Sequence, residues 1–259
     1  MDAEEKTIAG FYDDLAPEYD EMTGLEKRFV QERPFFRLLV ERFHIATALD
    51  AGCGSGFHAL LLSELGVEVT AIDASKEMIR LLEKHAGERN MRIDRIVGTF
   101  ESLNTLVSKK FDAVFSMGNS LAHVLTNQAL SRSLRNFHSV LKPGGILFVQ
   151  LLNYDRILER RERILGEKNT GMKTFVRFYE YEKDAIVFNI LTKSSDATSS
   201  AEHIQSVRLH PLVRDELIPQ LESVGFKELS VFGSISLDAF RKKDSKDLVV
   251  LAHKVPTKD

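Results

Sequence analysis

The sequence predicts an α/β fold in which a mostly parallel, Rossmann-like sheet with an antiparallel last strand carries an inserted antiparallel sheet. Between residues 47 and 151, short apolar runs alternate with helical patterns, which is typical of βαβ units. A turn with three glycines follows the first run, and two late apolar runs are joined by a short link. With 259 residues, of which 43% are hydrophobic, the chain is long enough for one elaborated domain over 1–259.

The first part of the chain, residues 1–45, is expected to form a helical cap ahead of the sheet. Its two helical patterns cover residues 4–23 and 29–43. The last helix of the βαβ region ends at LKPGG, because Pro143 and the glycines after it favour a turn. The strands expected in this region are 47–51, 67–72, 93–97, 111–116 and 146–151, and the helices are 56–65, 75–86, 101–107 and 127–141.

The insertion is expected over residues 172–210. A charged helix over about 154–165 precedes it, since Arg and Glu mix at helical spacing in RILERRERILGEK. Three strands are expected, with Lys183-Asp184 as a hairpin turn and SSDATSSA, 194–201, as a polar loop. The expected strands are 173–182, 185–194 and 202–210.

The end of the chain returns to the main sheet. A helix over 211–224 is expected to end at Gly225, because glycine readily adopts the left-handed conformation that closes many helices. Strands over 226–233 and 247–254 follow, and their short link predicts an antiparallel addition to the sheet edge.

The composition argues against several classes of partner. A net charge of −3 gives no reason to expect nucleic acid, and no apolar run approaches the roughly 20 residues that span a membrane. The acidic, polar start MDAEEKTIAG is not a secretory signal, and one cysteine excludes an internal disulfide, so we expect a reducing, cytoplasmic location. The eight histidines lack metal-site spacing, so no catalytic metal is expected.

The most informative segment is LDAGCGSG, at the carboxyl end of the first strand, where open parallel sheets bind ligands. A dinucleotide turn requires G-x-G-x-x-G, but here the spacing is G-x-G-x-G and Phe57 replaces the last glycine. The G-x-x-x-x-G-K-[ST] loop of many ATP-binding proteins is absent from the sequence. Asp73, at the end of the second strand, could accept both hydroxyls of a ribose. An adenosine-containing ligand without a pyrophosphate fits both features.

These motifs resemble the class I S-adenosylmethionine-dependent methyltransferases. The resemblance covers residues 11–151 and the elements from 211 onward, and it includes FYDDLAPEYD, LDAGCGSG, AIDAS, FDAVFSMGNSLAHV and LKPGGILFV in that order. It implies S-adenosyl-L-methionine as cofactor and a small-molecule methyl acceptor. Adenine N-methyltransferases of nucleic acids carry an Asp/Asn-Pro-Pro-Tyr/Phe motif where this chain has GNSL, so a nucleic acid substrate is not expected.

The resemblance also assigns cofactor contacts. The glycine turn would wrap the methionine part, Asp73 would hold the ribose, and Met78 would border the adenine. A tyrosine ahead of the sheet would cover the cofactor, although helix packing explains the same tyrosines. After the third strand, Thr99 replaces the usual acid, and Phe100 either stacks on adenine or packs in the core. The cofactor-binding candidates are Tyr12, Tyr19, Asp50, Gly52, Gly54, Gly56, Asp73, Met78, Thr99, Phe100 and Met117.

The segment SMGNSLAHV, after the fourth strand, resembles the glycine and sarcosine N-methyltransferase branch, as does LNYDRIL at 152–158. In that branch the asparagine lies beside the substrate, so Asn119 and His123 are the catalytic candidates. A helical turn would place both on one face, whereas simple capping is the alternative for Asn119 and Ser120.

One position departs from that branch. Leu152 stands where the branch has an arginine that grips the carboxylate of the amino acid substrate, so glycine itself is in doubt as the acceptor. Arg177 and Arg208 are the candidate replacements. The first hypothesis is methyl transfer to a small amine. The alternatives are an O- or C-methyltransferase of a larger apolar metabolite and a non-catalytic sensor of the cofactor. The residues leave the oligomeric state open.

Overall fold

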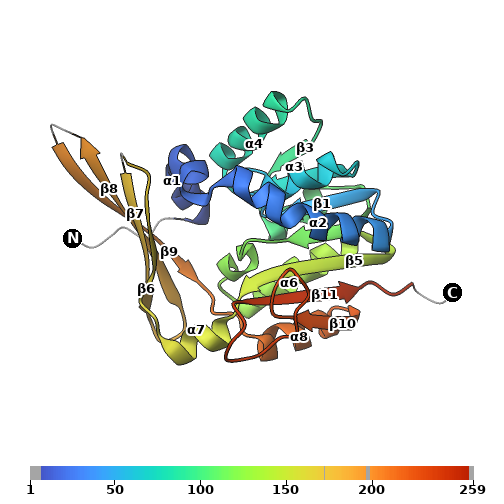
Figure 1. The fold of residues 1–259 in the computed structure, drawn as a ribbon. Coiled ribbons are helices and arrows are strands. Elements are labelled where there is room, and N and C mark those ends of the chain that lie inside the picture. Colours follow the sequence, from blue (N-terminus) through green and yellow to red (C-terminus); the bar gives the residue numbers. More distant parts are fainter. Residues whose placement is uncertain (1–6, 172, 197–198, 257–259) are drawn as a thin grey trace.

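The computed structural model describes residues 7–171, 173–196 and 199–256, which form two separate sheets and their helices (Figure 1). The main sheet has seven strands in the order β10-β11-β5-β4-β1-β2-β3, and a second, four-stranded antiparallel sheet has the order β6-β7-β8-β9. In the main sheet only β11 runs antiparallel to its neighbours β5 and β10. The predicted fold class is confirmed.

The main-sheet strands lie within a few residues of their predicted positions, except at the start of β5. The interiors of the five central strands are buried on both faces, which explains their near-continuous apolar runs, whereas the two edge strands β3 and β10 are largely exposed or half-buried. The segment LKPGG is not a free turn, because β5 already begins at Leu141 and Gly144 N donates to Lys254 O over 2.7 Å. The strands are β1 (Thr47–Ala51), β2 (Glu68–Asp73), β3 (Asp94–Val97), β4 (Phe111–Ser116), β5 (Leu141–Leu152), β10 (Lys227–Phe232) and β11 (Asp247–His253).

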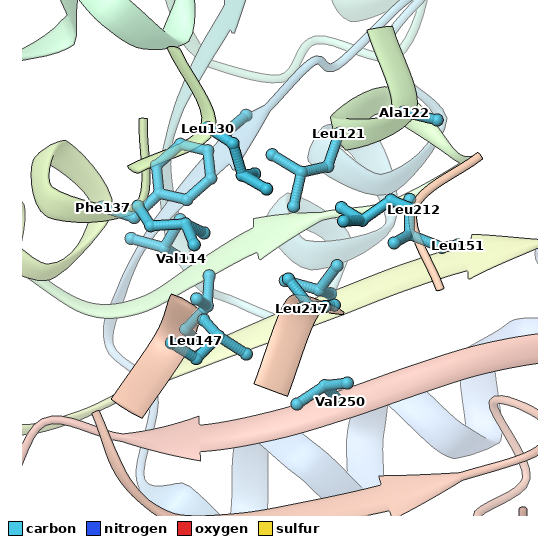
Figure 2. Packing of buried hydrophobic residues seen from close by; sticks show 14 of the residues in the cluster. Val114, Leu121, Ala122, Leu130, Phe137, Leu147, Leu151, Leu212, Leu217 and Val250 are labelled. Carbon is cyan, nitrogen blue, oxygen red and sulfur yellow. The ribbon is translucent and has the colours of Figure 1, made fainter. Parts of the chain in front are cut away.

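Helices cover both faces of the main sheet. Buried residues of α2, α3 and α4 pack on one face, and those of α6 and α8 pack on the other. Figure 2 shows Phe137 of α6 and Leu217 of α8 beside Val114, Leu147 and Val250 of the sheet. The helices are α2 (Leu25–Phe43), α3 (Phe57–Glu64), α4 (Lys76–Glu88), η1 (Phe100–Ser102), α5 (Leu103–Leu106), η2 (Ser120–His123), α6 (Asn127–Val140), α7 (Tyr154–Arg160) and α8 (Arg214–Ser223).

The inserted sheet has four strands where three were predicted. The helix expected to reach residue 165 ends at Arg160, since Arg161 adopts a left-handed conformation with φ 48° and the next segment pairs with β7. The expected loop 194–201 is also wrong, because β8 and β9 pair as far as Asp196 and Ser199; residues 197–198 lie outside the described part. The strands are β6 (Ile164–Asn169), β7 (Lys173–Tyr181), β8 (Ile186–Asp196) and β9 (Ser199–Leu209).

Helix α1 (Ile8–Thr23) lies between the inserted sheet and the main sheet (Figure 1). Phe11 packs against the inserted sheet in a cluster with Phe175, and Asp13 caps α4 by accepting hydrogen bonds from Ser75 Oγ at 2.6 Å and Glu77 N at 3.1 Å. These contacts hold α1 over the carboxyl ends of β1 and β2. The predicted helix began at residue 4, and residues 1–6 lie outside the described range.

Candidate active site

A cavity of about 360 Å³ opens at the carboxyl ends of β1 to β4, where the sequence predicts a ligand site. Its volume lies in the range of small-molecule and cofactor pockets. The loops after these four strands form one side, and side chains of α1 and α2 form the other. The predicted site residues that line it are Tyr12, Tyr19, Gly52, Gly54, Asp73, Thr99, Phe100, Met117 and His123.

The glycine turn brings the backbone to the edge of this cavity. Gly52 has φ 77°, and a Cβ atom added there would lie 2.6 Å from Ser120 Cβ, so glycine alone fits without movement. Gly52 N and Cys53 N both donate to Ile72 O of β2. The turn therefore follows β2 closely and exposes its own backbone to a ligand.

The carboxylate of Asp73 joins the turn to the second strand. Its Oδ2 accepts a hydrogen bond from Gly54 N at 2.8 Å, and its Oδ1 accepts one from Ser75 N at 2.9 Å. Burial raises the pKa of Asp73, while these two N–H donors act in the opposite direction. Each carboxylate oxygen has a second lone pair, so the group can still accept hydrogen bonds from the two hydroxyls of a ribose.

Tyr12 and Tyr19 reach the cavity from α1. Tyr12 Oη and His123 Nε2 are 2.8 Å apart. Burial raises the pKa of Tyr12 and raises that of Tyr19 to about 12, whereas burial lowers the pKa of His123 to about 4. All three groups are therefore neutral at physiological pH. Among the described residues His123 Nδ1 has no hydrogen-bond partner, although it is buried.

Arg28, which the sequence analysis did not single out, brings a guanidinium group to the cavity wall. It lies on α2, where Nε donates to Glu32 Oε1 at 2.9 Å and the guanidinium carbon is 4.0 Å from the centre of the Phe57 ring. Glu32 Oε2 is also 3.3 Å from His58 Nε2. Two features of the sequence are consistent with this position of Arg28. Arg28 and Glu32 are four residues apart, as in an ion pair on a helix, and the bulky Phe57 stands where the G-x-G-x-x-G motif has its last glycine.

Thr99 and Phe100 lie at the other end of the cavity. Thr99 Oγ1 accepts a hydrogen bond from Ser102 N at 3.3 Å and so caps η1. The ring of Phe100 lines the cavity and also packs edge-on against Phe137, with ring centres 5.2 Å apart. Phe100 therefore contacts both the site and the core, and the two alternatives for it are not exclusive.

Three predicted contact residues lie behind the cavity wall. Asp50 is 1% exposed and Met78 is fully buried, and neither they nor Gly56 line the cavity. Met78 is turned inward because α4 begins just before it and its N–H donates to Ser75 Oγ. Burial raises the pKa of Asp50 to about 7, while the backbone N–H of Ala59 acts in the opposite direction.

Asn119 does not line the cavity, contrary to the expectation that it shares a face with His123. It adopts a left-handed conformation with φ 69° just before η2. Its Nδ2 donates to Tyr154 Oη at 2.8 Å, and its Oδ1 accepts from Leu152 N at 3.0 Å. The amide is thus occupied in tying the end of β4 to the end of β5, and Asn119 is a positioning residue in this structure.

A half-buried ion pair fastens α1 to the site and predicts a pH-dependent stability. His85 Nε2 lies 2.8 Å from Asp20 Oδ2, and His85 Nδ1 lies 3.0 Å from Ser55 O in the glycine turn. The hydrogen bond to Asp20 raises the pKa of His85 above 6.5, so this stabilisation is complete below 6.5 and is lost as pH rises through the raised value.

We therefore expect His85→Gln to lower the free energy of unfolding by about 1 kcal/mol in acid and by less in base, since Asp20 is partly solvated. Urea unfolding of both proteins at about pH 5.5 and about pH 8.5 measures the difference. An equal difference at the two pH values would show that the pair does not titrate as described.

The described residues also bear on a membrane span and on a metal site. None of their helices is both long enough and apolar enough to cross a membrane. Within the same residues, no three side chains of His, Cys, Asp or Glu gather closely enough to hold a metal ion.

Comparisons with known proteins agree with this geometry. A family model described as "Methyltransferase domain" matches residues 48–145. A glycine/sarcosine N-methyltransferase of Aphanothece halophytica is 26% identical over 257 residues, covering 95% of this chain and 89% of the relative. A ubiquinone biosynthesis O-methyltransferase of Xanthomonas campestris is 38% identical over 108 residues, covering 42% of this chain and 44% of the relative.

A solved S-adenosylmethionine-dependent methyltransferase from Clostridium acetobutylicum shares the fold, with a TM-score of 0.81, 15% identity, and coverage of 94% of this chain and 99% of the other. The cavity fits S-adenosylmethionine: it offers a carboxylate for a ribose, a guanidinium for a carboxylate, and a glycine backbone that a single Cβ would block. The chain therefore contains a methyltransferase domain over residues 48–145, and S-adenosylmethionine is its cofactor.

Proposed function

We propose that this methyltransferase transfers a methyl group to the amine nitrogen of a small molecule. The observation that carries the proposal is the neutral, half-buried imidazole of His123, whose buried Nδ1 has no partner among the described residues and whose ring lines the cavity beside Tyr12. A relative that matches nearly the whole chain, 26% identical, is named a glycine/sarcosine N-methyltransferase, which supports the same class of acceptor.

The cofactor would be held by residues at the two ends of the cavity. Asp73 would accept the ribose hydroxyls, and Arg28 would pair with the carboxylate of the methionine part. Thr99 and Phe100 would contact the adenine. When bound, the cofactor supplies an electrophilic methyl group, and the protein has to present a nucleophile in line with it and free of water. Positioning of this kind contributes about 7–11 kcal/mol in well-oriented systems.

His123 would orient the nucleophile. In the tautomer in which His123 Nε2–H donates to Tyr12 Oη, Nδ1 accepts a hydrogen bond from an amine N–H, which directs the lone pair of the amine away from the ring. With a pKa of about 4, His123 does not retain a proton at neutral pH, so the amine has to arrive uncharged and the released proton passes on to solvent. Tyr12 holds the ring through its hydroxyl.

A second candidate is methyl transfer to oxygen. It is favoured by the O-methyltransferase relative at 38% identity, although that match covers 42% of this chain. The apolar side chains of Val124, Leu125 and Ala129 line the cavity and would suit a larger apolar acceptor. A neutral His123 would accept a hydrogen bond from a hydroxyl as readily as from an amine.

The test is a methyl-transfer assay of the purified protein with small amines and with phenols, with cofactor binding measured separately by calorimetry. For the amine that turns over, we expect His123→Ala to lower kcat about 10- to 100-fold with unchanged cofactor affinity. His203→Ala, at an exposed position on β9, is the control and should retain full activity. Turnover of phenols alone would favour the oxygen acceptor, and binding without any turnover would favour a sensor.

A further inference from the structure

Glu32 of α2 contacts the guanidinium of Arg28 but does not itself line the cavity. Arg28 Nε donates to Glu32 Oε1 over 2.9 Å. The two residues are four positions apart on one helix, a spacing that places them side by side on the same face. Glu32 therefore binds the Nε edge of the guanidinium, and the two Nη groups of Arg28 are the ones that can donate to a ligand in the cavity.

Two residues at the start of α3 support this pair. The guanidinium carbon of Arg28 lies 4.0 Å from the centre of the Phe57 ring. The last glycine of a G-x-G-x-x-G motif, which Phe57 replaces, could not make this contact. His58 Nε2 is 3.3 Å from Glu32 Oε2, so the tautomer with its proton on Nε2 donates to the oxygen that Arg28 does not use. Arg28 Nη2 is 3.5 Å from the same nitrogen, which is too far for a strong hydrogen bond.

The charges of these groups make the direction of the guanidinium important. Although burial acts to raise it, the hydrogen bond from His58 and the charge of Arg28 hold the pKa of Glu32 below its usual value. Burial lowers the pKa of His58, while the hydrogen bond to Glu32 acts in the opposite direction. At physiological pH Glu32 is therefore a carboxylate and His58 is neutral. Because Glu32 offsets much of the charge of Arg28, the binding of an anionic ligand depends on where the N–H groups of Arg28 point.

We propose that Glu32 is a positioning residue for the cofactor, which fixes Arg28 so that both Nη groups face the carboxylate of the methionine part. This inference rests on the pairing of Arg28 with that carboxylate in the proposed function. A bidentate pair requires two parallel N–H groups in line with the carboxylate oxygens, and a long, flexible side chain loses entropy when it is fixed in that geometry. Glu32 at one edge and Phe57 against the plane fix it before the cofactor binds. The site thereby favours the cofactor over its decarboxylated form.

The experiment compares two ligands by calorimetric titration of the purified protein: S-adenosylhomocysteine and its decarboxylated form, which keeps the amine and the adenosine. We expect Glu32→Ala to weaken the first about 10-fold and the second about 2-fold or less. Loss of the Glu32 charge alone would strengthen the binding of a carboxylate, so weaker binding reports that Arg28 is misplaced. Arg28→Gln should weaken the first ligand about 10- to 100-fold, again with little effect on the second.

Further variants separate the position of Glu32 from its charge. Glu32→Gln keeps an oxygen that accepts from Arg28 Nε but removes the charge, so it should bind S-adenosylhomocysteine at least as tightly as the unsubstituted protein. Glu32→Asp keeps the charge but withdraws the oxygens by one methylene, and it should lose affinity as Glu32→Ala does. Glu64→Ala is the control, because it removes another ion pair between α2 and α3, with Arg33 at 2.9 Å, and it should change neither affinity.

The outcomes separate this inference from the proposed function. If Arg28→Gln weakens only the ligand with the carboxylate while Glu32→Ala and Glu32→Asp bind it normally, the inference is wrong and the role of Arg28 stands. The inference is also wrong if Glu32→Ala weakens both ligands equally, or if Glu32→Gln loses as much affinity as Glu32→Ala. If Arg28→Gln leaves the affinity for S-adenosylhomocysteine unchanged, the inference and the proposed cofactor contact of Arg28 both fall.

Discussion

Replacing Gly52 with alanine should abolish detectable methyl transfer and lower the free energy of unfolding by about 2–4 kcal/mol. The backbone at Gly52 is left-handed, with φ 77°, which costs an alanine about 1–2 kcal/mol. The new methyl group would also lie 2.6 Å from Ser120 Cβ and 3.1 Å from Phe100 Cζ. Ser120 Oγ donates to Gly52 O at 3.1 Å, so the turn after β1 and the turn after β4 are in direct contact and would be forced apart.

The matched control is Gly66→Ala. Gly66 has φ 86°, and a Cβ added there meets no atom within 4 Å, so this variant carries the same backbone strain without the clash. Calorimetric titration with S-adenosylmethionine and urea unfolding of both variants separate the two effects. We expect Gly66→Ala to bind normally with a loss of about 1–2 kcal/mol in stability. If Gly52→Ala binds S-adenosylmethionine with the same affinity as Gly66→Ala, close contact between the two turns is not required for cofactor binding.

The main sheet could be predicted because its signals are local. Strands such as β1 and β4 are buried on both faces, so nearly every residue in them is apolar. Short, nearly continuous apolar runs of this kind are typical of parallel sheets. The three glycines after β1 indicated a turn with a left-handed backbone, and Asp73 lies at the end of the adjacent strand β2. Carboxyl ends of neighbouring parallel strands meet at one edge, so these residues could be placed together from their positions alone.

The charged segment 156–168 could not be assigned correctly because its structure depends on a distant strand. Its alternating charges favour a helix when considered alone. In the fold, β6 pairs with β7 along Gly166 to Asn169 and gains a hydrogen-bonded ladder that outweighs the local preference. The strand lies at the sheet edge, where charged side chains are common, and this composition is easily mistaken for an exposed helix.

The role of Asn119 depended on contacts that sequence spacing does not reveal. The asparagine was correctly placed after β4, but its amide bonds to Leu152 and Tyr154 at the end of the next strand. The amide of an asparagine has two N–H donors and a carbonyl acceptor, and these can form hydrogen bonds to a substrate or to neighbouring protein groups equally well. Arg28 was missed for a related reason, since it reaches the cavity from a helix whose position over the sheet is set by tertiary packing.

Replacing Asp73 with alanine should weaken S-adenosylmethionine binding about 100-fold or more. Each hydrogen bond from a hydroxyl to a charged carboxylate contributes about 1.5–3 kcal/mol, and two ribose hydroxyls would donate to Asp73. The same carboxylate already accepts from Gly54 N and Ser75 N, so the variant will also loosen the turn. A loss of affinity alone would therefore not distinguish ribose binding from support of the glycine turn.

The ligand can make that distinction. A 2′,3′-dideoxy analogue of S-adenosylhomocysteine lacks both hydroxyls, so Asp73→Ala should change its affinity far less than that of S-adenosylhomocysteine itself. Asp13→Ala removes another α4 contact without touching the cavity, and it should lower stability while weakening both ligands equally. If Asp73→Ala weakens the two ligands to the same degree, the carboxylate acts only by supporting the turn. A selective loss for the ligand that carries hydroxyls would assign the ribose to Asp73, because only a group in contact with those hydroxyls responds to their removal.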